Sequence, residues 1–291
     1  MFNEGIPKEK QIDKGKNLDM KSIVKILIIA GACAATGAHA AHPAYDTLIA
    51  HRGESFDAPE NTLVAYRMAV ERGFGFECDV YLSSDGRVFS FHDRNLKRTT
   101  GIDMDCCDAS WEEVVSKVDA GAWKGEKWRG VRPALLEEIL PLARDGRYIY
   151  LEVKTGCEII PYIKKAIDAQ NAASAANMLF ISFSEDVCKR LKETFPDYKV
   201  FLLAGEIDAG EAVAKLRTLG IDGLDVWFDA NTVTGEYAQT LRDAGFELHV
   251  WTCDRLEHTL AAFAAGAQSV TTNCAQKQLD EYLKRGERQT D

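Results

Sequence analysis

The sequence predicts an α/β protein of the (β/α)8 class, the TIM barrel, with a small inserted subdomain that caps the barrel after the second strand. From about residue 45 onward, short runs rich in β-formers alternate with segments of helical periodicity. The alternation continues for roughly 250 residues, the usual length of such a barrel. The chain has 46% hydrophobic and 27% charged residues, a composition that excludes disordered, collagen-like and low-complexity proteins.

Nine runs are typical of β-strands, which is one more than a barrel needs. Ser84-Asp85-Gly86-Arg87 is the signal of a two-residue hairpin turn, so 80–91 should fold back as an antiparallel ribbon and leave eight parallel strands. With Asp85-Gly86 as the turn, Asp79 should lie opposite His92. The nine predicted strands are 47–50, 76–80, 88–91, 149–153, 179–182, 200–203, 223–226, 248–251 and 269–271.

Helical patterns lie between the strands. In 61–72, Leu63, Tyr66 and Val70 fall on one face, and Asn61 is the candidate N-cap. The stretch 94–133, which contains Gly, Trp and charged residues, is predicted to be the small insertion that caps the barrel mouth. The other predicted helices are 185–195, 211–219, 236–244 and 255–265.

The first forty residues are predicted to precede the barrel domain, which spans 41–291. Residues 1–19 are polar and lack apolar periodicity, and we interpret them as a start-site extension. The basic start after Met20, a short apolar run and the small residues up to Ala40 indicate a signal peptide and therefore an exported protein, periplasmic or secreted. The apolar run is too short for a transmembrane helix. Lipoprotein processing at Cys33 is the alternative.

Charge and cysteine content limit the partners of the protein. Residues 1–40 hold six of the 35 basic and four of the 45 acidic residues, so the mature chain has a net charge of −12. Such a chain repels phosphates, and we expect no nucleic acid partner and no stable membrane insertion. Oligomeric state and disulfide pattern stay open. We interpret the seven remaining cysteines as buried thiols, although the vicinal pair allows a strained disulfide; they are Cys78, Cys106, Cys107, Cys157, Cys188, Cys253 and Cys274.

Barrel enzymes form their active sites at the carboxyl ends of the strands. Glu77 and Asp79 are two residues apart and therefore share the strand face that looks into the barrel mouth. The hairpin returns its last residues to the same end. The residues predicted to meet there are His51, Arg52, Glu77, Asp79, His92, Glu152, Lys154 and Trp251.

Three converging carboxylates are the strongest chemical signal among these residues. Like charges repel and burial of ions is costly, so Glu77, Asp79 and Glu152 need a cation. An all-oxygen ligand set favours a divalent metal, Ca²⁺ or Mg²⁺, over zinc.

The remaining residues suit chemistry on an anionic substrate. His51 and His92 titrate near neutral pH and can exchange protons with it. Arg52 and Lys154 provide positive charge for its anionic group. Trp251, at a strand end, is predicted to line the substrate pocket.

These motifs occur together in one family: over about residues 47–285 the sequence resembles the glycerophosphodiester phosphodiesterases, TIM barrels related to phospholipase C. The resemblance implies metal-dependent hydrolysis of a small-molecule glycerophosphodiester to sn-glycerol 3-phosphate and an alcohol. It implies His51 and His92 as the catalytic pair. It further implies Glu77, Asp79 and Glu152 as metal ligands, with Arg52 and Lys154 on the phosphate. The matching motifs include His51-Arg52-Gly53, Pro59-Glu60-Asn61-Thr62, Glu77-Cys78-Asp79-Val80, Phe91-His92-Asp93, Glu152-Val153-Lys154 and Val250-Trp251-Thr252.

The sequence leaves three alternatives. A lysophospholipase D-like enzyme or a glycerophosphoinositol-preferring phosphodiesterase would use the same residues, and Trp123 and Trp128 in the insertion would favour a lysolipid. A catalytically inactive binding protein would need no proton-transfer pair, which the chain retains. At Thr272-Asn273 the family usually has Thr-Asp, and we expect little effect on catalysis because this position closes the barrel.

Overall fold

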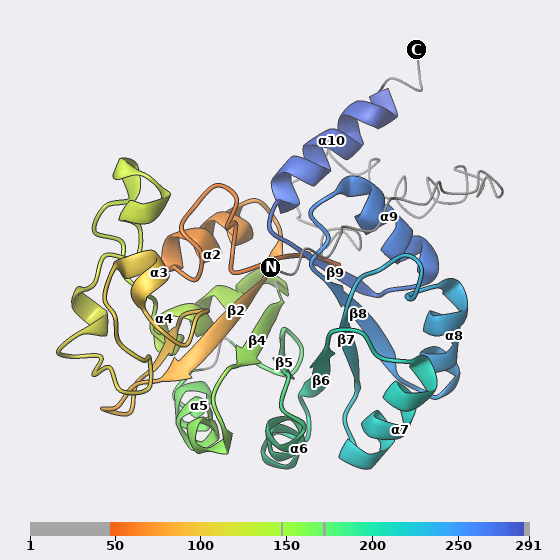
Figure 1. Ribbon diagram of the computed structural model, residues 1–291, viewed down its shortest axis with the longest axis horizontal. Coiled ribbons are helices and arrows are strands. Elements are labelled where there is room, and N and C mark those ends of the chain that lie inside the picture. The colour runs from red at the N-terminus through yellow and green to blue at the C-terminus, as the bar shows by residue number, and fades with distance from the viewer. Residues whose placement is uncertain (1–46, 147, 171–172, 288–291) are drawn as a thin grey trace, which may run out of the picture. The chain divides into compact units, whose positions relative to one another are not determined.

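The computed structural model describes residues 47–146, 148–170 and 173–287, and the predicted barrel is confirmed there (Figure 1). Eight parallel strands pair in the order β1-β9-β8-β7-β6-β5-β4-β2, and the pairing of β1 with β2 closes the ring. The predicted signal peptide lies outside the described residues. The strands are β1 Leu48–Ala50, β2 Gly75–Leu82, β3 Val88–Ser90, β4 Ile149–Val153, β5 Met178–Ser182, β6 Lys199–Ala204, β7 Gly223–Trp227, β8 Glu247–Trp251 and β9 Ser269–Thr272.

The ninth strand, β3, pairs antiparallel with β2 outside the ring, as the hairpin signal predicted. The predicted register was wrong by one residue. Val80 pairs with Ser90, and the Phe91 amide donates to the Asp79 carbonyl at 3.1 Å, so Asp79 does not face His92. The turn is longer than two residues because the Asp85 carboxylate accepts hydrogen bonds from the backbone amides of Trp111 and Glu112 in the insertion.

Helices cover the outside of the strand ring (Figure 1). The predicted helix 61–72 is α2, and its N-cap is Thr62, whose hydroxyl accepts from the Ala65 amide, and not Asn61 as expected. Asn61 instead has a φ of 55° and is buried. The helices are α2 Leu63–Glu71, α3 Lys97–Thr100, α4 Leu136–Ile139, α5 Ile160–Asp168, α6 Glu185–Thr194, α7 Ala209–Leu219, α8 Gly235–Asp243, α9 Leu256–Ala265 and α10 Ala275–Glu287.

The segment 94–133 contains α3 and short 3₁₀ turns and packs around apolar side chains of its own. Leu96, Cys106 and Trp111 of this segment pack with Phe89 and Phe91 of the hairpin arm. The segment lies beside α2 and β2 and away from α6–α9 (Figure 1). It therefore reaches one side of the barrel only.

The interior of the ring is filled below the predicted site. Tyr150, Leu179, Ile181 and Phe201 form an apolar layer, and the ring of the buried His249 stacks on Phe201 with centroids 4.1 Å apart. Side chains of this kind form the packed core of a (β/α)8 barrel, not a pore. Polar chemistry is thereby confined to the carboxyl ends of the strands.

The seven cysteines of the described region are free thiols, five of them buried. This agrees with their interpretation as small apolar side chains. Among the described residues, no helix is long and apolar enough to cross a membrane.

Candidate active site

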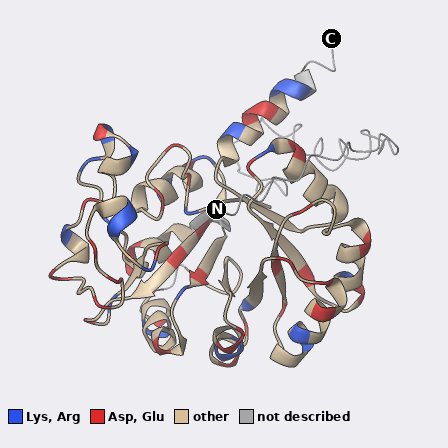
Figure 2. Ribbon diagram, viewed as in Figure 1, with Lys and Arg blue, Asp and Glu red and all other residues tan. Residues whose placement is uncertain are grey.

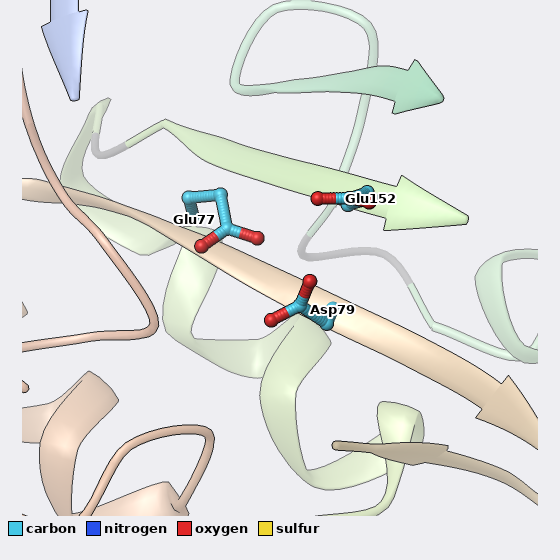
Figure 3. A group of neighbouring side chains, drawn as sticks. All are labelled: Glu77, Asp79 and Glu152. Carbon is cyan, nitrogen blue, oxygen red and sulfur yellow. The ribbon is translucent and has the colours of Figure 1, made fainter. Parts of the chain in front are cut away.

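Three buried carboxylates meet where β2 and β4 lie side by side. Glu77 and Asp79 come from β2 and Glu152 from β4, and the strand register places Asp79 directly beside Glu152. One carboxylate oxygen from each residue lies within 4.8 Å of the others. Figure 3 shows the three side chains on the same side of the two strands. The acidic positions of β2 and β4 can be followed in Figure 2.

The negative charge of these carboxylates is not fully balanced by the protein. Burial, together with the neighbouring carboxylates, raises the pKa of Glu77 well above its usual value. Burial and Asp79 raise the pKa of Glu152 to about 8. In the described structure Glu77 Oε1 is buried without a hydrogen-bond partner. An all-oxygen donor set with an unsatisfied buried oxygen fits a hard divalent cation such as Ca²⁺ or Mg²⁺.

Two cationic side chains partly balance the carboxylates. Lys154 Nζ lies 2.8 Å from Glu152 Oε1 and 3.2 Å from Asp79 Oδ1. The Arg52 guanidinium lies 3.7 Å from Asp79 Oδ2, and its backbone amide donates to Glu77 Oε2 at 2.9 Å. Arg52 has a φ of 58°, and this left-handed conformation turns its amide toward the acidic cluster. Both cations therefore border the carboxylates, where an anionic group would also bind.

His51 follows β1 and borders the same cluster. Its Nε2 lies 3.8 Å from Glu77 Oε2, and its Nδ1 lies 2.7 Å from Asn273 Oδ1. An amide oxygen only accepts, so Nδ1 carries the proton and Nε2 keeps a free lone pair. Burial and the nearby Arg52 lower the pKa of His51 to about 4, which leaves its ring neutral.

The orientation of the Asn273 amide is set by Asp254. Asn273 Nδ2 donates to Asp254 Oδ2 at 2.6 Å, and its backbone amide donates to Asp254 Oδ1 at 2.8 Å. A carboxylate only accepts, so the amide nitrogen must face Asp254 and the amide oxygen must face His51. We expected position 273 only to close the barrel. That expectation was incomplete, because β9 is the neighbour of β1 and the residue after β9 therefore contacts the residue after β1.

His92 reaches the site from the hairpin. Its Nδ1 lies 2.7 Å from Asp93 Oδ1, and Arg98 Nε donates to Asp93 Oδ2 at 2.6 Å. His92 lies close enough to interact electrostatically with Asp79 and with His51. The structure thus brings the two histidines to one end of the barrel from different elements.

Asn61 is a site residue whose part sequence reasoning missed. Its side chain donates to Asp79 Oδ2 at 2.7 Å and accepts from the Tyr66 hydroxyl at 2.7 Å and from the Ser90 hydroxyl at 3.0 Å. Asn61 therefore holds one predicted metal ligand in place. The available signal was the polar side chain of Asn61 directly before Thr62. The sequence predicted that Asn61 itself was the N-cap.

Trp251 ends β8 at the mouth, as predicted. Its indole Nε1 donates to the Asp225 carbonyl at 3.1 Å, which fixes the ring. The predicted site residues thus lie at one end of the barrel, as expected, although Trp251 comes from the side that β8 forms and the carboxylates from the side that β2 and β4 form.

Comparison with known proteins places this arrangement in a family. The profile of the Glycerophosphoryl diester phosphodiesterase family matches residues 51–277. The chain is 30% identical over 234 residues to a glycerophosphodiester phosphodiesterase of Caldanaerobacter subterraneus subsp. tengcongensis, covering 78% of this chain and 93% of that protein. It is 33% identical over 156 residues to mouse glycerophosphodiester phosphodiesterase 1, covering 52% of this chain and 46% of that protein.

Solved structures support the same family assignment. A phosphodiesterase of Oleispira antarctica, solved in complex with the product sn-glycerol-3-phosphate, is 26% identical and superposes with a TM-score of 0.75 over 82% of this chain and 98% of that chain. A glycerophosphodiester phosphodiesterase of Thermotoga maritima is 26% identical, with a TM-score of 0.64 over 80% and 97%. The barrel, the convergent carboxylates and histidines, and these similarities together establish that the chain belongs to the glycerophosphoryl diester phosphodiesterase family and is a phosphodiesterase enzyme.

Proposed function

We propose that this enzyme is exported and hydrolyses glycerophosphodiesters to sn-glycerol 3-phosphate and an alcohol, with a divalent metal and a pair of histidines. The observation that carries the proposal is the meeting of Glu77, Asp79 and Glu152 within 4.8 Å of one another. The complex of the related Oleispira antarctica phosphodiesterase with sn-glycerol-3-phosphate supports the product.

The lysolipid alternative gains no support from the insertion. The Trp123 ring has Arg98 at 5.9 Å and Lys124 at 5.7 Å from its centroid, and the Trp128 ring has Lys127 at 4.7 Å. Rings that carry cations are poor surfaces for an acyl chain because the chain would have to displace them. We therefore retain a water-soluble diester as the substrate.

Some residues of the site stabilise charge, and the two histidines transfer protons. Glu77, Asp79 and Glu152 would hold Ca²⁺ or Mg²⁺, which when bound withdraws charge from the phosphoryl oxygens. Arg52 and Lys154 border this cluster and bind the phosphate from the protein side.

The histidines move protons around the phosphorus. The glycerol C2 hydroxyl of the substrate attacks phosphorus as one histidine removes its proton, and the other histidine protonates the departing alcohol. The resulting 1,2-cyclic phosphate is opened by water with the two roles reversed. No Ser, Thr or Cys among the predicted site residues is placed as a nucleophile, so a phosphoryl-enzyme intermediate is not required.

Removal of divalent metal should abolish hydrolysis across a panel of glycerophosphodiesters. We expect excess EDTA to stop turnover and Ca²⁺ or Mg²⁺ to restore it, because three buried acids need a cation. Glu152→Gln should weaken metal affinity, measured by calorimetry, more than it changes the melting temperature. Glu257→Gln, an exposed acid on α9, is the matched control. Full activity in EDTA with no bound metal by elemental analysis would contradict the assignment.

Loss of either catalytic histidine should stop the chemistry and leave the fold intact. His51→Ala and His92→Ala should each lower kcat by roughly two to four orders of magnitude. His258→Ala, on the exposed face of α9, should keep normal turnover. Near-normal kcat in either active-site variant, or a fall in melting temperature that accounts for the lost activity, would refute the acid–base pair.

The Asn273 amide should act on catalysis through His51. Asn273→Leu removes the acceptor for Nδ1–H, so we expect kcat to fall roughly ten- to thousandfold with little change in KM, since a histidine held in the wrong tautomer is a poor base. Asn273→Asp combined with Asp254→Asn keeps an acceptor for Nδ1–H and restores a donor between positions 254 and 273, and should recover most of the rate. ¹⁵N NMR of the imidazole should show the Nδ1–H tautomer in the parent and a mixture in Asn273→Leu. An unchanged tautomer with lowered activity would show that the residue is structural.

The cyclic route predicts that the C2 hydroxyl is indispensable. A substrate analogue with hydrogen in place of this hydroxyl should bind, measured as competitive inhibition, and should release no alcohol. The parent diester is the control at the same concentration. Cleavage of the analogue at a rate near that of the parent would mean that water attacks phosphorus directly.

A further inference from the structure

Three aromatic side chains, Phe183, Trp227 and Trp251, form a cluster at the barrel mouth that no step of the proposed reaction uses. The Trp251 ring meets Phe183 with centroids 5.6 Å apart and planes at 89°, and it meets Trp227 at 5.2 Å and 85°. Phe183 is 52% exposed and Trp227 is 50% exposed. We refer to these three residues as the aromatic cluster. Rings set at right angles, two of them half exposed, can contact a small group from more than one side.

The aromatic cluster begins directly beside the phosphate-binding side chains. Glu152 of β4 is in register with Ile181 of β5, so Phe183, the first residue after β5, lies at the level of Lys154, the first residue after β4. The Ser182 hydroxyl fixes this approach by donating to the Val153 carbonyl at 2.9 Å. Trp227 and Trp251 are in register on β7 and β8. A diester whose phosphate lies at Lys154 therefore has the cluster next to one of its two ester arms.

The two sides of the mouth differ in charge. Arg52 and Lys154 lie on the side that β1, β2 and β4 form. The segments after β5, β6, β7 and β8, which are 183–186, 205–208, 228–234 and 252–255, contain only one basic residue, Arg255, against six acidic residues. The six are Glu185, Asp186, Glu206, Asp208, Asp229 and Asp254. Lys215 pairs with Glu185 at 2.7 Å, and the remaining acids still give this side a net negative charge.

A buried carboxyl lies below the cluster, and because burial raises the pKa of Asp225 to about 8 it is largely neutral near pH 7. Asp225 lies two residues before Trp227 on the inward face of β7, and it is 1% exposed. Within the described structure its Oδ1 has no hydrogen-bond partner. Its backbone carbonyl accepts from the Trp251 indole, so the carboxyl and the cluster belong to one local unit.

We propose that the aromatic cluster binds the alkylammonium end of the alcohol that leaves, so that the preferred substrates are glycerophosphodiesters of a quaternary ammonium alcohol. The inference rests on the proposed function and names its substrate class. Aromatic faces attract quaternary ammonium groups through the ring quadrupole, and nearby carboxyl groups strengthen the attraction. A neutral polyol would gain only the packing of its C–H groups on the rings and no attraction to the acidic rim, and an anionic arm would be repelled by that rim.

The test compares two diesters that differ in charge and hardly in shape. Glycerophosphocholine carries a trimethylammonium group, and the corresponding 3,3-dimethylbutyl diester replaces its nitrogen by carbon. With the full chain loaded with metal, kcat/KM should be about threefold to thirtyfold higher for the choline diester. Trp227→Leu and Phe183→Leu should bring this ratio close to one, chiefly by lowering the choline value. Tyr162→Leu, which removes an exposed ring on α5, is the matched control and should leave the ratio unchanged.

The possible outcomes distinguish failure of the ammonium site from failure of the proposed hydrolysis. A ratio near one in the parent enzyme, or variants that lower both diesters equally, would overturn the ammonium site while hydrolysis itself continues. Failure to hydrolyse either diester would instead count against the proposed function. Lysophosphatidylcholine in neutral vesicles carries the same ammonium group. Its turnover relative to glycerophosphocholine separates a membrane-borne source of the group from a soluble one. A lysolipid preference that is lost in Trp227→Asn would assign the cluster to the acyl chain and overturn the ammonium site.

Discussion

The repulsion among three buried carboxylates is the constraint on which the rest of the site depends. Glu77, Asp79 and Glu152 share a small volume, and burial alone disfavours their charged forms. Lys154 and Arg52 offset part of this charge, and Asn61 fixes one oxygen of Asp79. Two cations against three acids leave a net negative site, which explains why a divalent ion and an anionic substrate can be held together there.

The barrel could be predicted from the sequence because strand runs and helical periods alternate along the whole chain. The carboxylates could be placed as well, since residues two apart on a strand share a face. The hairpin register could not, because the Asp85 carboxylate binds the amides of Trp111 and Glu112, a long-range contact that local turn statistics do not contain. The contact of Asn273 with His51 could not be predicted for a similar reason: it spans 222 positions and exists only because β9 pairs with β1.

The two halves of the mouth have different physical characters. The half formed by β1, β2 and β4 concentrates charge, hydrogen bonds and the histidines, and the half formed by β5 to β8 presents aromatic rings and acidic loops. In a ring of parallel strands every strand ends at the same face, so neighbouring halves can specialise without changing the scaffold. In the proposed function this separates chemistry at phosphorus from recognition of the alcohol on one surface.

The hairpin connects these functions to the insertion. The eight-stranded ring does not carry His92, which reaches the site because β3 folds back on β2. From His92 a chain of polar contacts runs through Asp93, Arg98 and Glu60 to Arg52, with distances of 2.6–2.9 Å. Arg98 and Glu60 each have an opposite charge on either side, which lowers the cost of holding them in a partly buried position. The insertion that supplies Arg98 therefore helps to set the positions of both His92 and Arg52, the residue proposed to bind the phosphate, although it touches only one side of the barrel.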